Sequence, residues 1–64
     1  MISFDNGCNW LDVDEISELS LVENWDVIEN MMDDEIREEV HEQGLFSKRE
    51  FLKKYLEIAG TLII

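Results

Sequence analysis

Residues 20–44 read SLVENWDVIENMMDDEIREEVHEQG, and this stretch decides the fold. Its apolar residues recur at steps of three or four, which places them on one face of a helix. Those residues are Leu21, Trp25, Ile28, Met32, Ile36 and Val40. Nine acids and one base, Arg37, lie among the other positions. Like charges at this spacing destabilise an isolated helix, so we expect the apolar face to be buried and the carboxylates to lie in water.

Capping signals divide this stretch. Ser20 and Glu23 match a capping box, in which each side chain satisfies a backbone N–H at the start of a helix. Asp33 or Asp34 can serve as a second cap, because Asp favours the first position of a helix over its interior. We expect either a kinked helix or two helices meeting near Asp33. Gly44, with an apolar residue after it, is typical of a helix end.

The N-terminal residues predict a β-hairpin. Residues 1–4 alternate apolar and polar side chains, and Asp5-Asn6-Gly7 favours a tight turn. Residues 8–11 can then return as a second strand. Asp12, followed by Glu15, favours a short helix over about residues 13–19.

The C-terminal residues predict a helix and a strand. Ser47 and Glu50 repeat the capping box, so we expect a helix from about Lys48 to Ala59, ended by Gly60. Its buried face comprises Phe51, Leu52, Tyr55 and Leu56. Residues 61–64 are apolar and β-prone, and we expect them to pair with residues 1–4 or to pack into the core. The predicted fold is one mostly helical α+β domain over residues 1–64, with two to four packed helices and a short N-terminal hairpin that a C-terminal strand can join.

Charge restricts the class of partner. The formal net charge is −11, and residues 5–42 contain fourteen acids and one base. Such a field disfavours direct binding to nucleic acid or to an anionic membrane and favours a basic protein partner. Because 45% of the residues are hydrophobic, the composition indicates a folded domain. With no signal-peptide pattern and no apolar run of bilayer length, we expect a cytoplasmic protein.

Metal, cofactor and catalytic sites are all weakly supported. One cysteine and one histidine provide neither an internal disulfide nor a zinc set. Asp12, Asp14 and Glu23 match three positions of a calcium-binding loop, but Ile16 and Ser17 stand where that loop requires a ligand and a glycine. We therefore expect no metal, no cofactor and no enzyme activity.

Four individual residues have simple structural interpretations. We expect His41 at the surface or its boundary, and Cys8 as a packed small side chain. Trp25 is expected in the core. Trp10 either joins the core, which is the interpretation we favour, or anchors an interface.

The acidic surface suggests mimicry of DNA. Helical carboxylates three or four residues apart repeat at roughly 5 to 6 Å, a spacing comparable to that of charges along a nucleic-acid backbone. A surface of this kind can occupy the basic channel of a DNA-binding complex. The residues expected to contact such a partner are Asp26, Glu29, Asp33, Asp34, Glu35, Glu38, Glu39 and Glu42. We expect Arg37 and the cations of residues 48–54 to pair with this acidic helix when the last helix folds back on it.

The C-terminal half also resembles known proteins. The segments MDDEIREEVHEQ and SKREFLKKYLEIAG are similar to small acidic proteins of phages and other mobile elements. Size, acidity and the lack of a catalytic set are similar to anti-CRISPR and anti-restriction proteins, among which DNA mimics block a Cas effector or a restriction enzyme. The resemblance implies an inhibitor acting in a bacterial host cell, and it does not indicate which defence system is the target.

Two other functions stay open. One is an interaction module that binds a different basic protein, as an antitoxin or a phage regulatory subunit does, and competition with DNA separates it from a mimic. The other is a small enzyme or metal protein, which calcium-dependent stabilisation or an activity lost with His41 would support. The chain can act as a monomer or a homodimer in each case.

Overall fold

The computed structural model describes residues 1–44 and 46–64. Within them, the molecule has four α-helices, one 3₁₀ turn and a two-stranded sheet, and measures 31 × 21 × 18 Å. The expected mostly helical α+β fold is therefore confirmed. The elements in order are β1 (Ile2–Ser3), η1 (Val13–Glu15), α1 (Glu18–Glu23), α2 (Trp25–Met31), α3 (Asp34–Glu42), α4 (Lys48–Ala59) and β2 (Leu62–Ile63).

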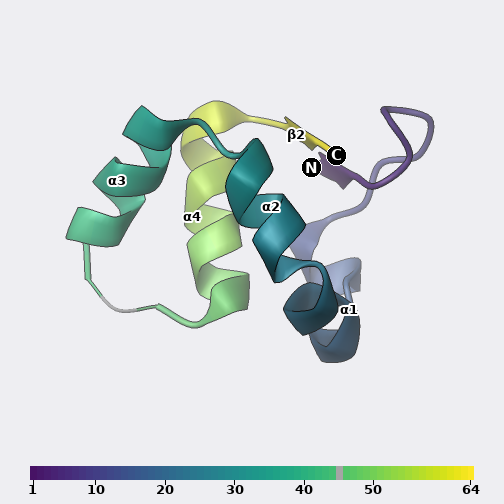
Figure 1. Ribbon diagram of the computed structural model, residues 1–64, viewed down its shortest axis with the longest axis horizontal. Coiled ribbons are helices and arrows are strands. Elements are labelled where there is room, and N and C mark those ends of the chain that lie inside the picture. The colour runs from purple at the N-terminus through teal and green to yellow at the C-terminus, as the bar shows by residue number, and fades with distance from the viewer. Residues whose placement is uncertain (45) are drawn as a thin grey trace.

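The core lies around α4, which the other elements surround (Figure 1). Its buried residues come from every helix and from both strands: Ile2, Val13, Ile16, Leu21, Ile28, Met32, Val40, Leu52, Tyr55, Leu56 and Leu62. The apolar positions expected to share one face do join this core, with Trp25 and Ile36 only half-buried at its edge. The carboxylates between those positions face outwards, as the pattern of charges required.

The two ends of the chain form the sheet. β1 and β2 run parallel, with Ile2 opposite Leu62 and Ser3 opposite Ile63. The expected pairing of residues 61–64 with residues 1–4 is confirmed. The expected hairpin is reduced to a single antiparallel bridge between Ile2 and Leu11, whose backbones exchange two hydrogen bonds of 2.9 Å.

A polar loop explains why the hairpin stops there. The buried Ser3 hydroxyl donates to Asp5 Oδ1 at 2.7 Å and accepts from the Gly7 amide at 2.8 Å. The same Asp5 oxygen accepts from the Asn9 amide at 2.7 Å. Asn6 and Gly7 both have positive φ, as the turn signal predicted. These side-chain bonds occupy backbone amides that a longer ladder would need.

The start of the first helix was predicted wrongly. Instead of a helix over residues 13–19 there is a 3₁₀ turn, and α1 begins only after Ser17. Ser17 caps α1 by accepting a hydrogen bond from the Ser20 amide at 3.2 Å, so Ser20 is not the cap. Val13 in the turn and Ile16 just after it are both buried, and α1 starts three residues earlier than the Ser20–Glu23 pattern indicated.

Residues 20–44 form three helices because two asparagine or aspartate positions interrupt them. Asn24 separates α1 from α2, and its side-chain Nδ2 donates to the Ser20 carbonyl at 2.7 Å. Asp33 separates α2 from α3 and caps α3. Of the two expected alternatives, two helices meeting near Asp33 is therefore the one that the structure has. The break at Asn24 was not expected. After α3, the Gly44 amide donates to the His41 carbonyl at 3.3 Å, and the expected role of Leu45 lies outside the described residues.

α4 has the predicted limits. Ser47 accepts from the Glu50 amide at 3.2 Å, and Gly60 ends the helix with a φ of 88°. Leu52, Tyr55 and Leu56 are buried, whereas Phe51 is half-buried at the edge of the core.

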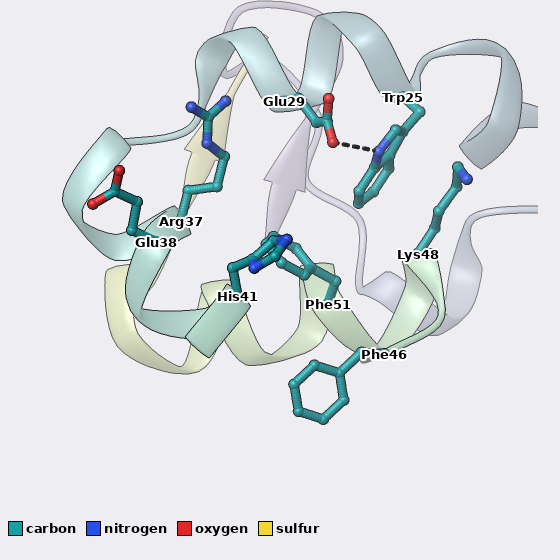
Figure 2. A pocket seen from close by; sticks show the side chains of 8 residues that line it. All are labelled: Trp25, Glu29, Arg37, Glu38, His41, Phe46, Lys48 and Phe51. Atoms are coloured by element: carbon teal, nitrogen blue, oxygen red, sulfur yellow. Dashed lines mark hydrogen bonds between the residues drawn. The ribbon is translucent and has the colours of Figure 1, made fainter. Parts of the chain in front are cut away.

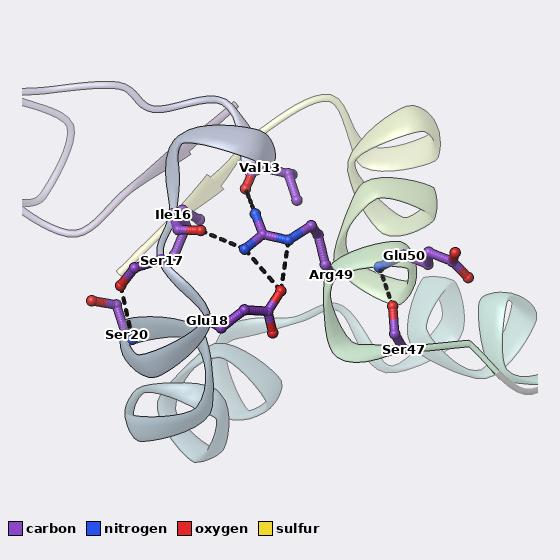
Figure 3. A network of polar contacts seen from close by, with 8 residues as sticks. All are labelled: Val13, Ile16, Ser17, Glu18, Ser20, Ser47, Arg49 and Glu50. Carbon is purple, nitrogen blue, oxygen red and sulfur yellow. Dashed lines mark hydrogen bonds and ion pairs between the residues drawn. The ribbon is translucent and has the colours of Figure 1, made fainter.

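The Arg49 guanidinium joins α4 to the first part of the chain (Figure 3). It donates to the Val13 carbonyl and, at 2.6 Å, to the Ile16 carbonyl. It also pairs with Glu18 at 3.0 Å. Both residues pack in the core, and Arg49 donates to the Ile16 carbonyl in place of water, whereas the Val13 carbonyl also accepts from the Ile16 amide at 3.3 Å.

Replacing Arg49 with methionine is expected to lower the free energy of unfolding by about 1–3 kcal/mol, because the Ile16 carbonyl loses its donor and the Val13 carbonyl loses one of two. Glu18→Ala is expected to lower it by less than about 1 kcal/mol, since the Glu18 side chain is 78% exposed. Urea denaturation measures both, with Lys53→Met on the same helix as the control. An equal loss from Glu18→Ala would show that the ion pair, and not carbonyl satisfaction, supplies the stability.

Asp5 gives the fold a pH dependence. Hydrogen bonds from the Asn9 backbone, the Asn9 side chain and Ser3 hold the Asp5 pKa below its ordinary value of 3.8. A lowered folded-state pKa stabilises the fold above the unfolded-state pKa, and this contribution is lost as the pH falls through the folded-state pKa. Asp5→Ala is therefore expected to be less stable than the parent at neutral pH, with a difference that shrinks in acid. A difference that stays constant over that range in urea titrations would contradict the role of the charge.

Candidate functional site

The expected partner-binding residues lie mostly in water. Asp26 and Glu29 belong to α2, and the others belong to α3 or to its cap. Glu29 is half-buried, and the rest are exposed: Asp26, Asp33, Asp34, Glu35, Glu38, Glu39 and Glu42. α3 buries Val40 and half-buries Ile36 against α4, so its carboxylates point away from that contact. We call the acids at 34, 35, 38, 39 and 42 the α3 acidic face.

Asp33 has a structural role. Its Oδ1 accepts from the Glu35 amide at 3.0 Å and from the Ile36 amide at 3.3 Å. Its own amide donates to the buried Tyr55 hydroxyl at 2.8 Å, which fixes the start of α3 on α4. Asp33 therefore positions the α3 acidic face as well as adding to its charge.

The cations of α4 do not neutralise the α3 acidic face. Over residues 1–44 and 46–64 the ion pairs are Arg37–Asp34, Arg49–Glu18 and Lys54–Glu57. The expected pairing of residues 48–54 with the acidic helix is therefore wrong. On the face itself, Asp34 alone has a cation within 4 Å in this part of the chain, Arg37 at 3.3 Å on the same helix.

A groove of about 480 Å³ lies between α2, α3 and the start of α4 (Figure 2). Three aromatic side chains line it, and charged side chains of both signs stand around them. The full lining is Trp25, Glu29, Arg37, Glu38, His41, Phe46, Lys48 and Phe51. Two of the expected partner-binding residues, Glu29 from α2 and Glu38 from α3, line this groove on either side of Arg37 (Figure 2). Here His41 is exposed and contributes to the wall.

Trp25 is held on two sides in the groove. Its indole Nε1 donates to Glu29 at 2.8 Å, and the Phe51 ring meets it edge to face with centroids 6.1 Å apart. Lys48 Nζ lies over the indole, 5.7 Å from the ring centroid, a geometry typical of a cation–π contact. The ring is thus fixed in place, and a cation already lies on it.

No known family, curated protein or solved structure matches this chain. The function therefore has to be argued from the α3 acidic face and the groove themselves. Among the described residues, none of the helices is long and apolar enough to cross a membrane. In the same residues, no three or more His, Cys, Asp or Glu side chains are grouped to hold a metal ion.

The structure also corrects two expectations at other residues. Trp10, for which we favoured the core, is 37% exposed. Cys8, expected to be packed, is an exposed free thiol. Both follow from the polar loop at residues 5–9, which holds the chain by hydrogen bonds and leaves little apolar surface to cover them.

Sequence reasoning missed the groove. It treated Trp25, Phe51 and His41 one at a time, and Phe46 and Lys48 were not considered as site residues. The available signal was the clustering of aromatic and basic residues at 46–51 in a chain that is otherwise acidic.

The two roles of Asp33 can be separated by substitution. Asp33→Ala removes the cap and is expected to lower the free energy of unfolding by about 1 kcal/mol. Asp33→Ser keeps a capping oxygen without the charge, so its stability should stay within a few tenths of a kcal/mol of the parent. Thermal and urea denaturation of the two variants test this. Equal loss in both would mean that the charge of Asp33, and not its cap, holds α3.

Proposed function

We propose that this protein is a non-enzymatic inhibitor that presents the α3 acidic face to a basic nucleic-acid-binding groove. The proposed target is a host defence complex of the kind that anti-CRISPR or anti-restriction DNA mimics block, in the cytoplasm of a bacterial host. The observation that supports this most is the placement of acids on the second half of α3.

Folding alone does not favour that placement. The C-terminal end of a helix carries partial negative charge, so acids there lower helix stability, by typically 0.3–1 kcal/mol each near the last turn. α3 nevertheless has Glu38, Glu39 and Glu42 in this half, with His41 as the basic residue of its last turn. Like-charge pairs such as Glu35–Glu39 and Glu38–Glu42 add repulsion. Acids retained against both effects are best explained by a basic partner.

The spacing of these acids suits competition with DNA. Side chains four residues apart on a helix lie roughly 6 Å apart along its axis, and one DNA strand carries a phosphate about every 3.4 Å. The mimic thus presents a line of negative charge to cationic side chains that normally hold phosphates. Long-range attraction speeds the encounter, and salt weakens it. Inhibition requires only that the inhibitor and DNA exclude each other.

The first experiment is a pull-down from cells that carry a CRISPR-Cas or a restriction system, repeated with excess duplex DNA. Displacement of a captured nucleic-acid-binding subunit by DNA would support mimicry. A partner that stays bound in excess DNA would overturn it. The chain would then be an acidic interaction module of the antitoxin or phage-regulatory kind.

Location of charge can be tested against total charge. The triple variant Glu35→Lys, Glu39→Lys, Glu42→Lys is expected to abolish capture of the DNA-displaced partner. The matched variant Asp14→Lys, Glu23→Lys, Glu57→Lys changes the net charge equally at exposed positions outside α3 and should retain capture. Lysines at 39 and 42, near the end of α3, are favourable to the helix and offset the unfavourable lysine at 35 in its first turn. Circular dichroism checks that both variants are folded. Equal loss of capture in the two variants would mean that only the overall field matters.

A further inference from the structure

The groove beside the α3 acidic face has the features of a binding site for a cationic side chain. One wall of it is the indole of Trp25, which a hydrogen bond to Glu29 and an edge-to-face contact with Phe51 hold in place. The face of an indole attracts cations more strongly than that of any other side chain. Lys48, over this ring at 5.7 Å, is the chain's own cation at that position.

Two carboxylates complete the groove from opposite helices. Glu29, from α2, accepts a hydrogen bond from a neutral indole N–H, which leaves its negative charge uncompensated by that contact. Glu38, from α3, is exposed, and the nearby Arg37 pairs with Asp34 at 3.3 Å. A displaced Lys48 would leave the Glu29 carboxylate beside the indole, with Glu38 further along the groove beyond Arg37 (Figure 2).

We propose that this groove binds an arginine side chain of a basic protein partner, which displaces Lys48 from Trp25. A guanidinium is planar, stacks on an indole and forms paired hydrogen bonds with carboxylates, so it fits the indole and Glu29 better than the ammonium that lies there, while Glu38 adds negative charge further along the groove. Lys48 is exposed, and its contact is of the weak class that a better cation can replace. The inference rests on the proposed function in one respect, namely that the partner is basic.

The competing occupant is an anion held by Arg37 and Lys48. A formal net charge of −11 repels it, and Asp34 already engages Arg37. The two occupants predict opposite effects of removing Lys48. Loss of this lysine uncovers Trp25 for a cation, but it takes away a ligand from an anion.

The test uses a blocked Gly-Arg-Gly peptide as the probe and the Trp25 indole N–H signal in an NMR titration as the readout. Trp10→Phe in every sample leaves that signal as the single indole resonance. The arginine peptide is expected to shift the signal saturably. A Gly-citrulline-Gly peptide, which has the same shape without the charge, is expected to leave it in place. Equal shifts with the two peptides would overturn the proposal, and so would no shift with either.

Two matched pairs of variants assign the binding to the groove. Lys48→Ala is expected to tighten arginine-peptide binding about two- to five-fold, the equivalent of one exposed cation–π contact, whereas Lys53→Ala on the same helix should not change it. Glu38→Gln is expected to weaken binding up to about five-fold, and Glu42→Gln, one turn further along α3, much less. Weaker binding in Lys48→Ala, together with a Trp25 shift caused by inorganic phosphate, would assign the groove to an anion and overturn the proposal.

The result of the peptide titration can be told apart from the result of the capture experiment that tests DNA mimicry. Glu35, Glu39 and Glu42, which the capture experiment reverses, do not line the groove among the described residues. If the peptide fails to bind while that triple variant still loses its partner, the α3 acidic face stands and the groove proposal falls. If the peptide binds while DNA fails to displace the partner, the groove stands without mimicry.

Discussion

Repulsion within α3 is the constraint on which the structure depends, because nine residues with five exposed acids do not form a stable helix alone. α4 supplies what α3 lacks. Val40 is fully buried in the core, and the Tyr55 hydroxyl receives the Asp33 amide at the point where α3 begins. α4 in turn is joined to η1 and to Ile16 after it through hydrogen bonds from Arg49. A charged surface is thereby displayed on a helix whose position is set by buried contacts elsewhere.

The sequence predicted a helix boundary correctly where a single capping side chain or glycine determined it. The limits of α4 followed from Ser47 and Gly60, and the break before α3 followed from the capping preference of aspartate. Sequence reasoning failed where two local signals competed. Ser17 and Ser20 are both acceptable caps, and the choice between them depended on how the buried residues of the 3₁₀ turn pack and on Arg49, which is 33 residues from Ile16.

The groove could not be predicted for a similar reason. Its walls come from three helices, and the angle between those helices is a property of the packed core. The acids predicted from the sequence to contact a partner are all exposed except Glu29, so the sequence predicted their exposure well. The sequence did not show what each acid does, because Asp33 caps α3 and Glu29 orients the Trp25 indole. A carboxylate's function in a small acidic domain thus depends on what its oxygens accept, which only the structure provides.

The parallel pairing of β1 with β2 brings the first and last residues side by side, and the Met1 amine donates to the Gly60 carbonyl at 3.1 Å. α3 lies across α4 from the two termini (Figure 1). An affinity tag or a fluorescent protein joined at either end would consequently start from the same place, away from the α3 acidic face. The pairing also joins residues about sixty positions apart, so on the ribosome β1 has no β2 to pair with until the chain has been made as far as Ile63.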